Sequence, residues 1–256
     1  MRSLANAVHA EWTKLRTTPS TVWLAAGAVG VTIAVSLLMT VALDPALCPT
    51  EATCQADPPT VALFGVRIGQ ALFLVLGVLA MGNEYGTRMI QTTLTAVPRR
   101  LTVVAAKLAA VVAVTLILGA LAVAGSWATW SAVNGWAVLP HSASMWRAVA
   151  GSMLYLVLIA VLGLGVGAIV RETAVGITIV TTMLYFAPLL LMFVKNPLWQ
   201  LRIQRYTPMN AGLAVQATKD LAAQPIAAWL GLGVLAAYAA VAILLAAALV
   251  KWRDVN

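Results

Sequence analysis

Six long apolar stretches constrain this sequence more than any other feature, and five of them contain no charged residue. A helix needs about 20 mostly apolar residues to cross the hydrocarbon core of a bilayer. Each stretch meets that length, and polar segments with Pro, Asn and Gly separate them. The sequence therefore predicts membrane spans at about 20–43, 61–82, 108–130, 148–170, 173–194 and 225–250.

Composition supports the same fold class. Of the 256 residues, 62% are hydrophobic and only 9% are charged, whereas a soluble domain carries about a quarter charged residues. A chain with so few charges cannot cover its own surface in water. We therefore expect an all-α, polytopic integral membrane protein in which residues 1–256 form a single transmembrane domain.

The positive charge predicts an orientation. The net charge is +8, and the basic residues punctuate the apolar stretches instead of forming one patch, which argues against nucleic acid as a partner. Six spans place both termini on one side, and that side holds 10 of the 16 Lys and Arg residues. Because loops rich in Lys and Arg stay in the cytoplasm, we expect a multi-pass protein of the cell membrane with both termini cytoplasmic.

The N-terminal segment, residues 2–18, has the pattern of an amphipathic helix. Its apolar stripe, at helical spacing, consists of Leu4, Val8, Trp12 and Leu15. A basic helix with Trp and Leu on one face lies in the membrane interface, against lipid. Glu11 falls within this stripe, where it either pairs with Lys14 one turn on or marks a contact with another protein surface.

The segment 83–107 mixes charged, threonine and apolar residues on the predicted cytoplasmic side. Gly82 and Gly86 flank its beginning, so the second span is expected to end there and a new helix to begin. Pro98 ends or bends that helix, because proline lacks an amide hydrogen. The segment is either an ordinary basic loop or a docking surface for a cytoplasmic partner.

Two motifs carry a resemblance to a known family. Residues 11–16 read EWTKLR, and residues 84–100 read EYGTRMIQTTLTAVPRR. Both resemble the corresponding segments of actinobacterial ABC-2-type permeases, the membrane subunits of ABC exporters. The six-span layout and the length match this family over essentially the whole chain.

The resemblance assigns roles to both motifs. It implies that residues 2–18 form a cytosolic elbow helix, with Glu11, Trp12, Lys14 and Arg16 in its motif. It also implies a coupling helix within residues 84–99 that contacts an ATPase. The residues assigned to this contact are Glu84, Tyr85, Thr87, Arg88, Thr92, Thr93, Arg99 and Arg100. At Gly86 the sequence departs from the family, whose members often have a bulkier polar residue there.

The implied function is outward transport of a hydrophobic or amphipathic substrate. No lysine has the Gly-rich setting of a P-loop, so ATP and Mg are expected on a separate ATPase subunit, and this chain is predicted to be neither an enzyme nor a holder of a cofactor or metal. A second permease copy, in a homodimer or heterodimer, would complete the pathway. Residues 195–224 would form a re-entrant segment on the extracellular side.

Polar residues inside spans are costly and point to function. The pathway candidates are Arg67, Gln70, Thr178, Thr181, Thr182 and Tyr185. Arg67 can instead extend to the interface, and threonines can bond to their own helix. Small residues allow close helix packing, which is the expected role of Gly163, Gly165 and Gly167.

The two cysteines, Cys48 and Cys54, lie in the predicted outer loop 44–59. An extracellular compartment permits a disulfide between them; the alternative is two free thiols.

Two other functions remain open. A membrane-embedded enzyme, such as an intramembrane protease or lipid-modifying enzyme, needs converging acid–base or metal-binding groups, but His9 and His141 fall outside the predicted spans, which also contain no carboxylate. An ion-coupled secondary transporter usually buries ionisable residues at the midplane, and none is expected there in this sequence.

Overall fold

The structure, a computed structural model, describes residues 2–42, 57–87, 89, 100–135, 142–190, 193–219, 221 and 224–252. Within these residues it is all-helical, and six helices are long and apolar enough to cross a membrane. They are α2 (Pro19–Ala42), α4 (Val66–Gly86), α6 (Arg100–Asn134), α7 (Ala143–Val170), α8 (Thr173–Leu190) and α11 (Ala228–Trp252). The prediction of an all-α polytopic membrane protein is confirmed.

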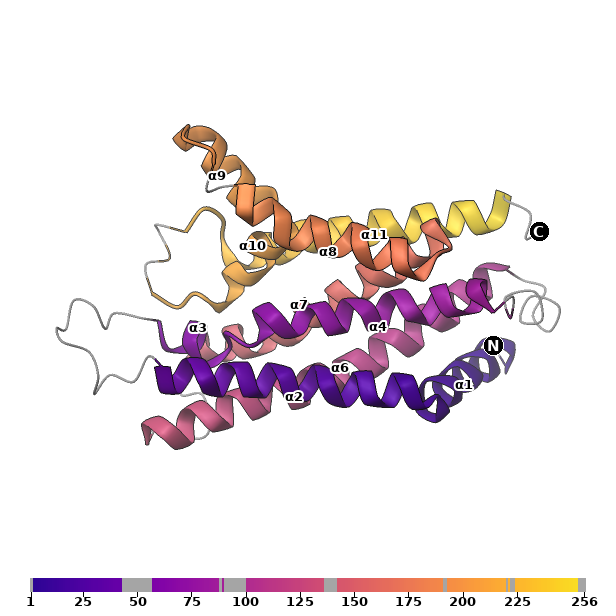
Figure 1. Ribbon diagram of the computed structural model, residues 1–256, viewed down its shortest axis with the longest axis horizontal. Helices are drawn as coiled ribbons and strands as arrows, with labels where there is room; N and C mark the ends of the chain where they lie inside the picture. The colour runs from indigo at the N-terminus through magenta and orange to yellow at the C-terminus, as the bar shows by residue number, and fades with distance from the viewer. Residues whose placement is uncertain are drawn as a thin grey trace.

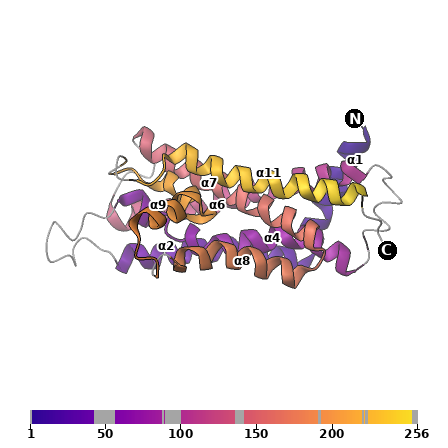
Figure 2. The same cartoon turned by 90° about the horizontal axis from the view of Figure 1, so that it is seen from above.

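The six helices run lengthwise through an elongated bundle, with both chain termini at one end (Figure 1). That end also carries the N-terminal helix α1 (Arg2–Thr17), which meets α2 at an angle (Figure 1). Pro19 is the first residue of α2 and has no amide hydrogen, so the chain does not continue as one straight helix. Seen from above, α8 and α11 lie along opposite edges of the bundle (Figure 2).

The core of the bundle is the packing of α4 against α7, and small residues make it possible. A Cβ atom on Gly77 of α4 would lie 1.9 Å from the carbonyl oxygen of Ala160 on α7. On α7, Cβ atoms on Gly163 and Gly167 would lie 2.5 and 2.9 Å from backbone oxygens of α4. Gly165 packs against Ala242 of α11 in the same way. The predicted packing role of the α7 glycines is confirmed.

Short helices gather at the other end of the bundle (Figure 1). They are α3 (Pro58–Ala62), α9 (Pro197–Tyr206), α10 (Pro208–Leu213) and the 3-10 helix η2 (Ala214–Gln216). Proline begins three of them, as is usual at a first helical position. The Asp57 carboxylate accepts hydrogen bonds from Thr218 and from the Lys219 amide, which joins the start of α3 to the segment after η2.

Several helix ends differ from the predicted span bounds. The second span was expected to begin at residue 61, but α4 begins at Val66, after the short helix α3. The fifth was expected to reach residue 194, but α8 ends at Leu190.

The second span was expected to end at Gly82, but α4 continues to Gly86. Gly82 does not break the helix; it lets α4 approach α8, since a Cβ there would lie 2.6 Å from the hydroxyl oxygen of Thr173. The third helix begins at Arg100 and not at residue 108, so Lys107 lies inside it.

Some predicted features lie outside the described residues. Among them are both cysteines of the proposed disulfide, Cys48 and Cys54. Of the predicted coupling helix, 84–99, the structure describes only residues 84–87 and 89, and the first three of these belong to α4.

Candidate functional site

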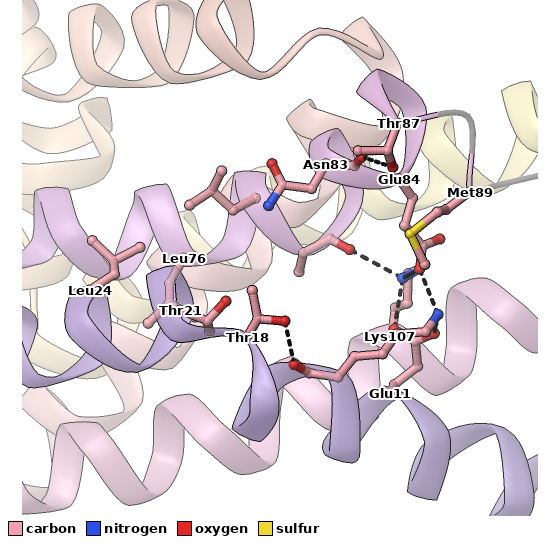
Figure 3. Close-up of a pocket in the computed structure, with 13 residues that line it drawn as sticks. Glu11, Thr18, Thr21, Leu24, Leu76, Asn83, Glu84, Thr87, Met89 and Lys107 are labelled. Atoms are coloured by element: carbon pink, nitrogen blue, oxygen red, sulfur yellow. Dashed lines mark hydrogen bonds and ion pairs between the residues drawn. The ribbon is translucent and has the colours of Figure 1, made fainter.

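Four charged side chains form one cluster at the end of the bundle that carries the termini (Figure 3). Lys14 of α1 contacts the Oε1 atoms of Glu11 and Glu84, both at 2.8 Å. Lys107 of α6 contacts Glu11 Oε2 and Glu84 Oε1, both at 2.7 Å. The cluster therefore ties α1 to the last turn of α4 and to the first part of α6.

Three members of the cluster are buried, Lys14 is partly exposed, and the charges balance. Lys107 is 2% exposed, Glu84 6% and Glu11 8%. Two carboxylates face two ammonium groups, and Lys107 also donates to the carbonyl oxygen of Ala80 at 3.2 Å. A buried charge is tolerated only when it is paired and hydrogen-bonded, and each charge here meets that condition.

The cluster shifts the pKa values of its α1 members. Burial alone would raise the pKa of Glu11, but the positive charges and hydrogen bonds of Lys107 and Lys14 outweigh burial and lower it below 4.5. Burial would likewise lower the pKa of Lys14, but its bonds to Glu11 and Glu84 raise it above 10.5. Both groups are therefore held in their charged forms around neutral pH.

A pocket of about 430 Å³ opens beside the cluster, between α1, α2, α4 and α6. Its walls combine the cluster with polar and apolar side chains, among them Thr18, Thr21, Leu24, Leu76 and Asn83 (Figure 3). The Oε2 atom of Glu84 is buried and has no hydrogen-bond partner among the described residues. The site thus places charged groups next to an apolar wall.

The predicted elbow residues divide into two groups. Glu11 and Lys14 belong to the cluster, and the expected pairing between them is confirmed. Trp12 is half-buried and Arg16 is exposed. The contact of Glu11 with Lys107 was not predicted.

The structure describes only half of the eight predicted ATPase-contacting residues. Glu84 points into the bundle, where it pairs with lysines. The Tyr85 ring lies 5.2 Å from the guanidinium of Arg171, and the Thr87 hydroxyl donates to the carbonyl oxygen of Asn83. Arg100 begins α6. The remaining four, Arg88, Thr92, Thr93 and Arg99, lie outside the described residues.

Two ionisable residues that were expected outside the spans, in the segment 83–107, are buried near helix ends. Glu84 and Lys107 are buried inside α4 and α6, two helices long enough to span. Each helix extends beyond its uncharged stretch, and pairing across the two helices neutralises both side chains. The sequence contained a sign of this position for Lys107, because it interrupts an apolar run that otherwise begins at residue 101.

A second polar arrangement lies toward the opposite end of the bundle. The carbonyl oxygen of Arg67 accepts hydrogen bonds from the Gln70 amide at 2.8 Å and from the Tyr185 hydroxyl at 2.9 Å. The Tyr155 hydroxyl in turn donates to Gln70 Oε1, and both of these side chains are fully buried. Three predicted pathway residues therefore meet, together with Tyr155, which the sequence gave no reason to select.

The threonines of α8 do not join this arrangement. Thr178 and Thr182 are exposed, and Thr181 is half-buried. The Thr178 hydroxyl donates to the carbonyl oxygen of Ala174 on its own helix, at 3.0 Å. Self-bonding of this kind satisfies a threonine in an apolar setting without any ligand.

The fold and the two polar arrangements define the class: a multi-pass α-helical membrane protein with a paired charge cluster at one end and an arginine-centred polar site toward the other. The sequence matches no family model and none of the curated proteins with which it was compared.

Proposed function

We propose that this chain is the membrane subunit of an ATP-driven exporter of the ABC-2 type. The observation that supports it is the meeting of the two motifs on which the resemblance depends. Glu11 and Lys14 come from the first motif, Glu84 comes from the second, and all three share one ion-pair cluster. Two motifs that lie some 70 residues apart in the chain are therefore in contact with each other.

The cluster suggests how a cytoplasmic motor would move the bundle. A separate ATPase, carrying ATP and Mg, would press on residues 84–99, which continue from the last turn of α4. The Glu84 carboxylate connects that turn to α1 through Lys14 and to α6 through Lys107. A displacement of this end of α4 would move three elements together and tilt α4 against α7 and α8.

The proposal includes an assembly and an orientation. Two permease copies, identical or different, would enclose the route of a hydrophobic or amphipathic substrate in the cell membrane. Both termini, the cluster and residues 84–99 would face the cytoplasm, where the motor is. Residues 195–224 would lie on the outer side, as a re-entrant segment.

Site-directed labelling tests the orientation and the docking surface together. In a background with Cys48 and Cys54 changed to Ser, Thr87→Cys places one exposed thiol within the proposed docking segment. A membrane-impermeant maleimide applied to intact cells should not label it, whereas the matched variant Lys219→Cys, exposed at the other end, should be labelled. Labelling of Thr87→Cys from outside would refute the proposal.

Coupling is tested by charge reversal. Arg88→Glu should abolish cross-linking of Thr87→Cys to the partner ATPase and should remove the permease-dependent part of ATP hydrolysis in the purified complex. Membrane insertion and the elution volume should not change, since the residue lies on the predicted docking surface. Normal cross-linking and hydrolysis in Arg88→Glu would show that the motor does not dock there.

The burial of Glu84 and Lys107 inside two helices supports a second candidate, an ion-coupled secondary transporter. Such a protein moves protons or other ions without a motor. Proteoliposomes that contain this chain alone distinguish the two: dissipation of an imposed pH gradient, lost in Glu84→Gln, would favour the second candidate, and a tight membrane would favour the exporter.

A further inference from the structure

A polar pocket of about 400 Å³ lies at the end of the bundle opposite the charge cluster. Elements from four parts of the chain surround it: the α3–α4 region, the end of α8, the α9–η2 segment and the residues before α11. Its size falls in the range of about 300–1,000 Å³ that small ligands occupy. Its polar lining consists of Thr60, Arg67, Gln204, Asn210, Gln216 and Gln224.

Arg67 brings one positive charge into this pocket, and no described residue of the pocket supplies a counter-charge. None of the described residues that line the pocket is acidic. Within the described part of the chain, the Arg67 guanidinium makes no ion pair or hydrogen bond, and its side-chain contact is with the Phe64 ring, at 5.7 Å from the ring centroid. The carboxylate of Asp57, one turn before Thr60, is already engaged with Thr218 and Lys219.

The backbone of Arg67 is fixed from two sides. Tyr185 of α8 and Gln70 of α4 both donate to its carbonyl oxygen, and Tyr155 of α7 holds Gln70 in turn. Such bonds fix the start of the arginine side chain before any ligand arrives, which lowers the cost of binding. Side chains from α4, α7 and α8 thus position the backbone from which the Arg67 guanidinium extends.

The other polar groups complete a site for an anion. Gln204, Asn210 and Gln224 carry amide N–H donors without charge, and they come from α9, α10 and the segment before α11. Gln216 is buried and is held by its bond to the Ser152 hydroxyl at 3.0 Å. The planar fork of an arginine guanidinium matches carboxylate and phosphate oxygens. We propose that this pocket binds an anionic oxyacid group, a phosphate or carboxylate, with Arg67 as its charged ligand.

Two probes separate the sources of such a group. The full chain, purified in an uncharged detergent, is tested with radiolabelled inorganic phosphate by equilibrium dialysis and with phosphatidylglycerol by native mass spectrometry. Arg67→Gln should weaken binding by about 10- to 100-fold, which is the effect of losing a charged hydrogen-bond donor. Arg67→Lys should lose less affinity, because lysine keeps the positive charge but lacks the planar guanidinium fork.

Arg202→Gln is the matched control, because Arg202 is an exposed arginine of α9 that stacks on Trp199 and does not line the pocket. Gln204→Ala, which removes an amide and no charge, provides a second variant if Arg67→Gln does not fold, and it should bind more weakly than the parent chain. If Arg67→Gln weakens the binding of inorganic phosphate, the ligand of the pocket is a soluble anion. If it weakens only the binding of phosphatidylglycerol, the ligand is a lipid headgroup. Binding of neither probe, or equal losses in Arg67→Gln and Arg202→Gln, would overturn the proposal. The outcome does not depend on the exporter function, since no ATPase takes part.

Discussion

The two ends of the bundle differ in how their charged side chains are paired. At the end with the termini, two carboxylates and two ammonium groups lie within 2.8 Å of one another in pairs. At the other end, one guanidinium lies in a pocket whose other polar side chains, among the described residues, are neutral amides and a hydroxyl. The charges of the first arrangement balance, whereas the second carries one positive charge that no described residue pairs.

This difference separates a structural role from a binding role. A charge-balanced cluster ties helices together, because any single change leaves one buried charge uncompensated. An arginine that forms no ion pair with the described residues gains no stability from them by pairing, but it can attract an anion from outside the chain. We therefore expect substitutions in the cluster to act mainly on stability and substitutions around Arg67 mainly on ligand affinity.

The largest effect is expected for Lys107→Met. The side chain keeps a similar length, but Glu11 and Glu84 then share only Lys14 in a buried site. Breaking a buried ion pair from one side costs about 3–5 kcal/mol. Thermal unfolding in detergent should show a markedly lower melting temperature, while Arg67→Gln should change it much less.

A double variant sharpens this result. Lys107→Met combined with Glu84→Gln leaves one carboxylate and one ammonium, Glu11 and Lys14, which remain paired at 2.8 Å. The double variant should be more stable than Lys107→Met alone, because the uncompensated charge is gone. If it is equally unstable or less stable, charge balance is not what the cluster provides.

The fold could be predicted from the sequence because hydrophobic length alone determines spans. All six helices were expected, and the role of the α7 glycines followed from their small size. The predicted end of the second span and the predicted start of the third span were wrong for one reason. A helix can continue past its uncharged core when the charged residues near its end find partners. Glu84 and Lys107 find those partners on other helices, and hydropathy along one helix contains no information about them.

The candidate sites were predictable only in part. Glu11 stood out because it interrupts an apolar stripe, and Arg67 and Gln70 because they interrupt a span. Pairing with Lys14 followed from helical spacing. The contact with Lys107, some 96 residues away, and the bond from Tyr155 to Gln70 depend on how helices pack side by side. A tyrosine in an apolar run gives no sign of where its hydroxyl will bond.

Low pH is expected to weaken the docking of α1, with an effect of intermediate size. Because the pKa of Glu11 in the folded state lies below its ordinary value of 4.5, the stabilisation by this carboxylate is fully present above pH 4.5 and is lost as the pH falls through the lowered pKa. The raised pKa of Lys14 keeps its contribution intact up to pH 10.5, and it is lost only as the pH rises through the raised pKa. The docking of α1 should therefore be constant between these limits.

Hydrogen exchange of α1 measures this dependence. Protonation of Glu11 removes charge-assisted hydrogen bonds, each worth about 1.5–3 kcal/mol, so protection of α1 should fall at acidic pH once intrinsic exchange rates are divided out. Glu11→Gln is the control, because it lacks the titrating group: its α1 should be less protected already at pH 7, with a flatter pH dependence. Loss of protection at the same pH in both proteins would assign the effect to another group.

The smallest effect is expected for Tyr185→Phe, at the arginine end. The change removes one hydroxyl that donates to the carbonyl oxygen of Arg67, while the Gln70 amide still donates to the same atom. One neutral hydrogen bond contributes about 0.5–1.5 kcal/mol, so the melting temperature should fall slightly and anion binding by less than tenfold. Tyr238→Phe, which loses an exposed bond to the carbonyl oxygen of Tyr206 at 3.3 Å, should change neither. If Tyr185→Phe weakened binding as much as Arg67→Gln, the hydroxyl itself would contact the anion, and the ligand would extend from the pocket toward α8.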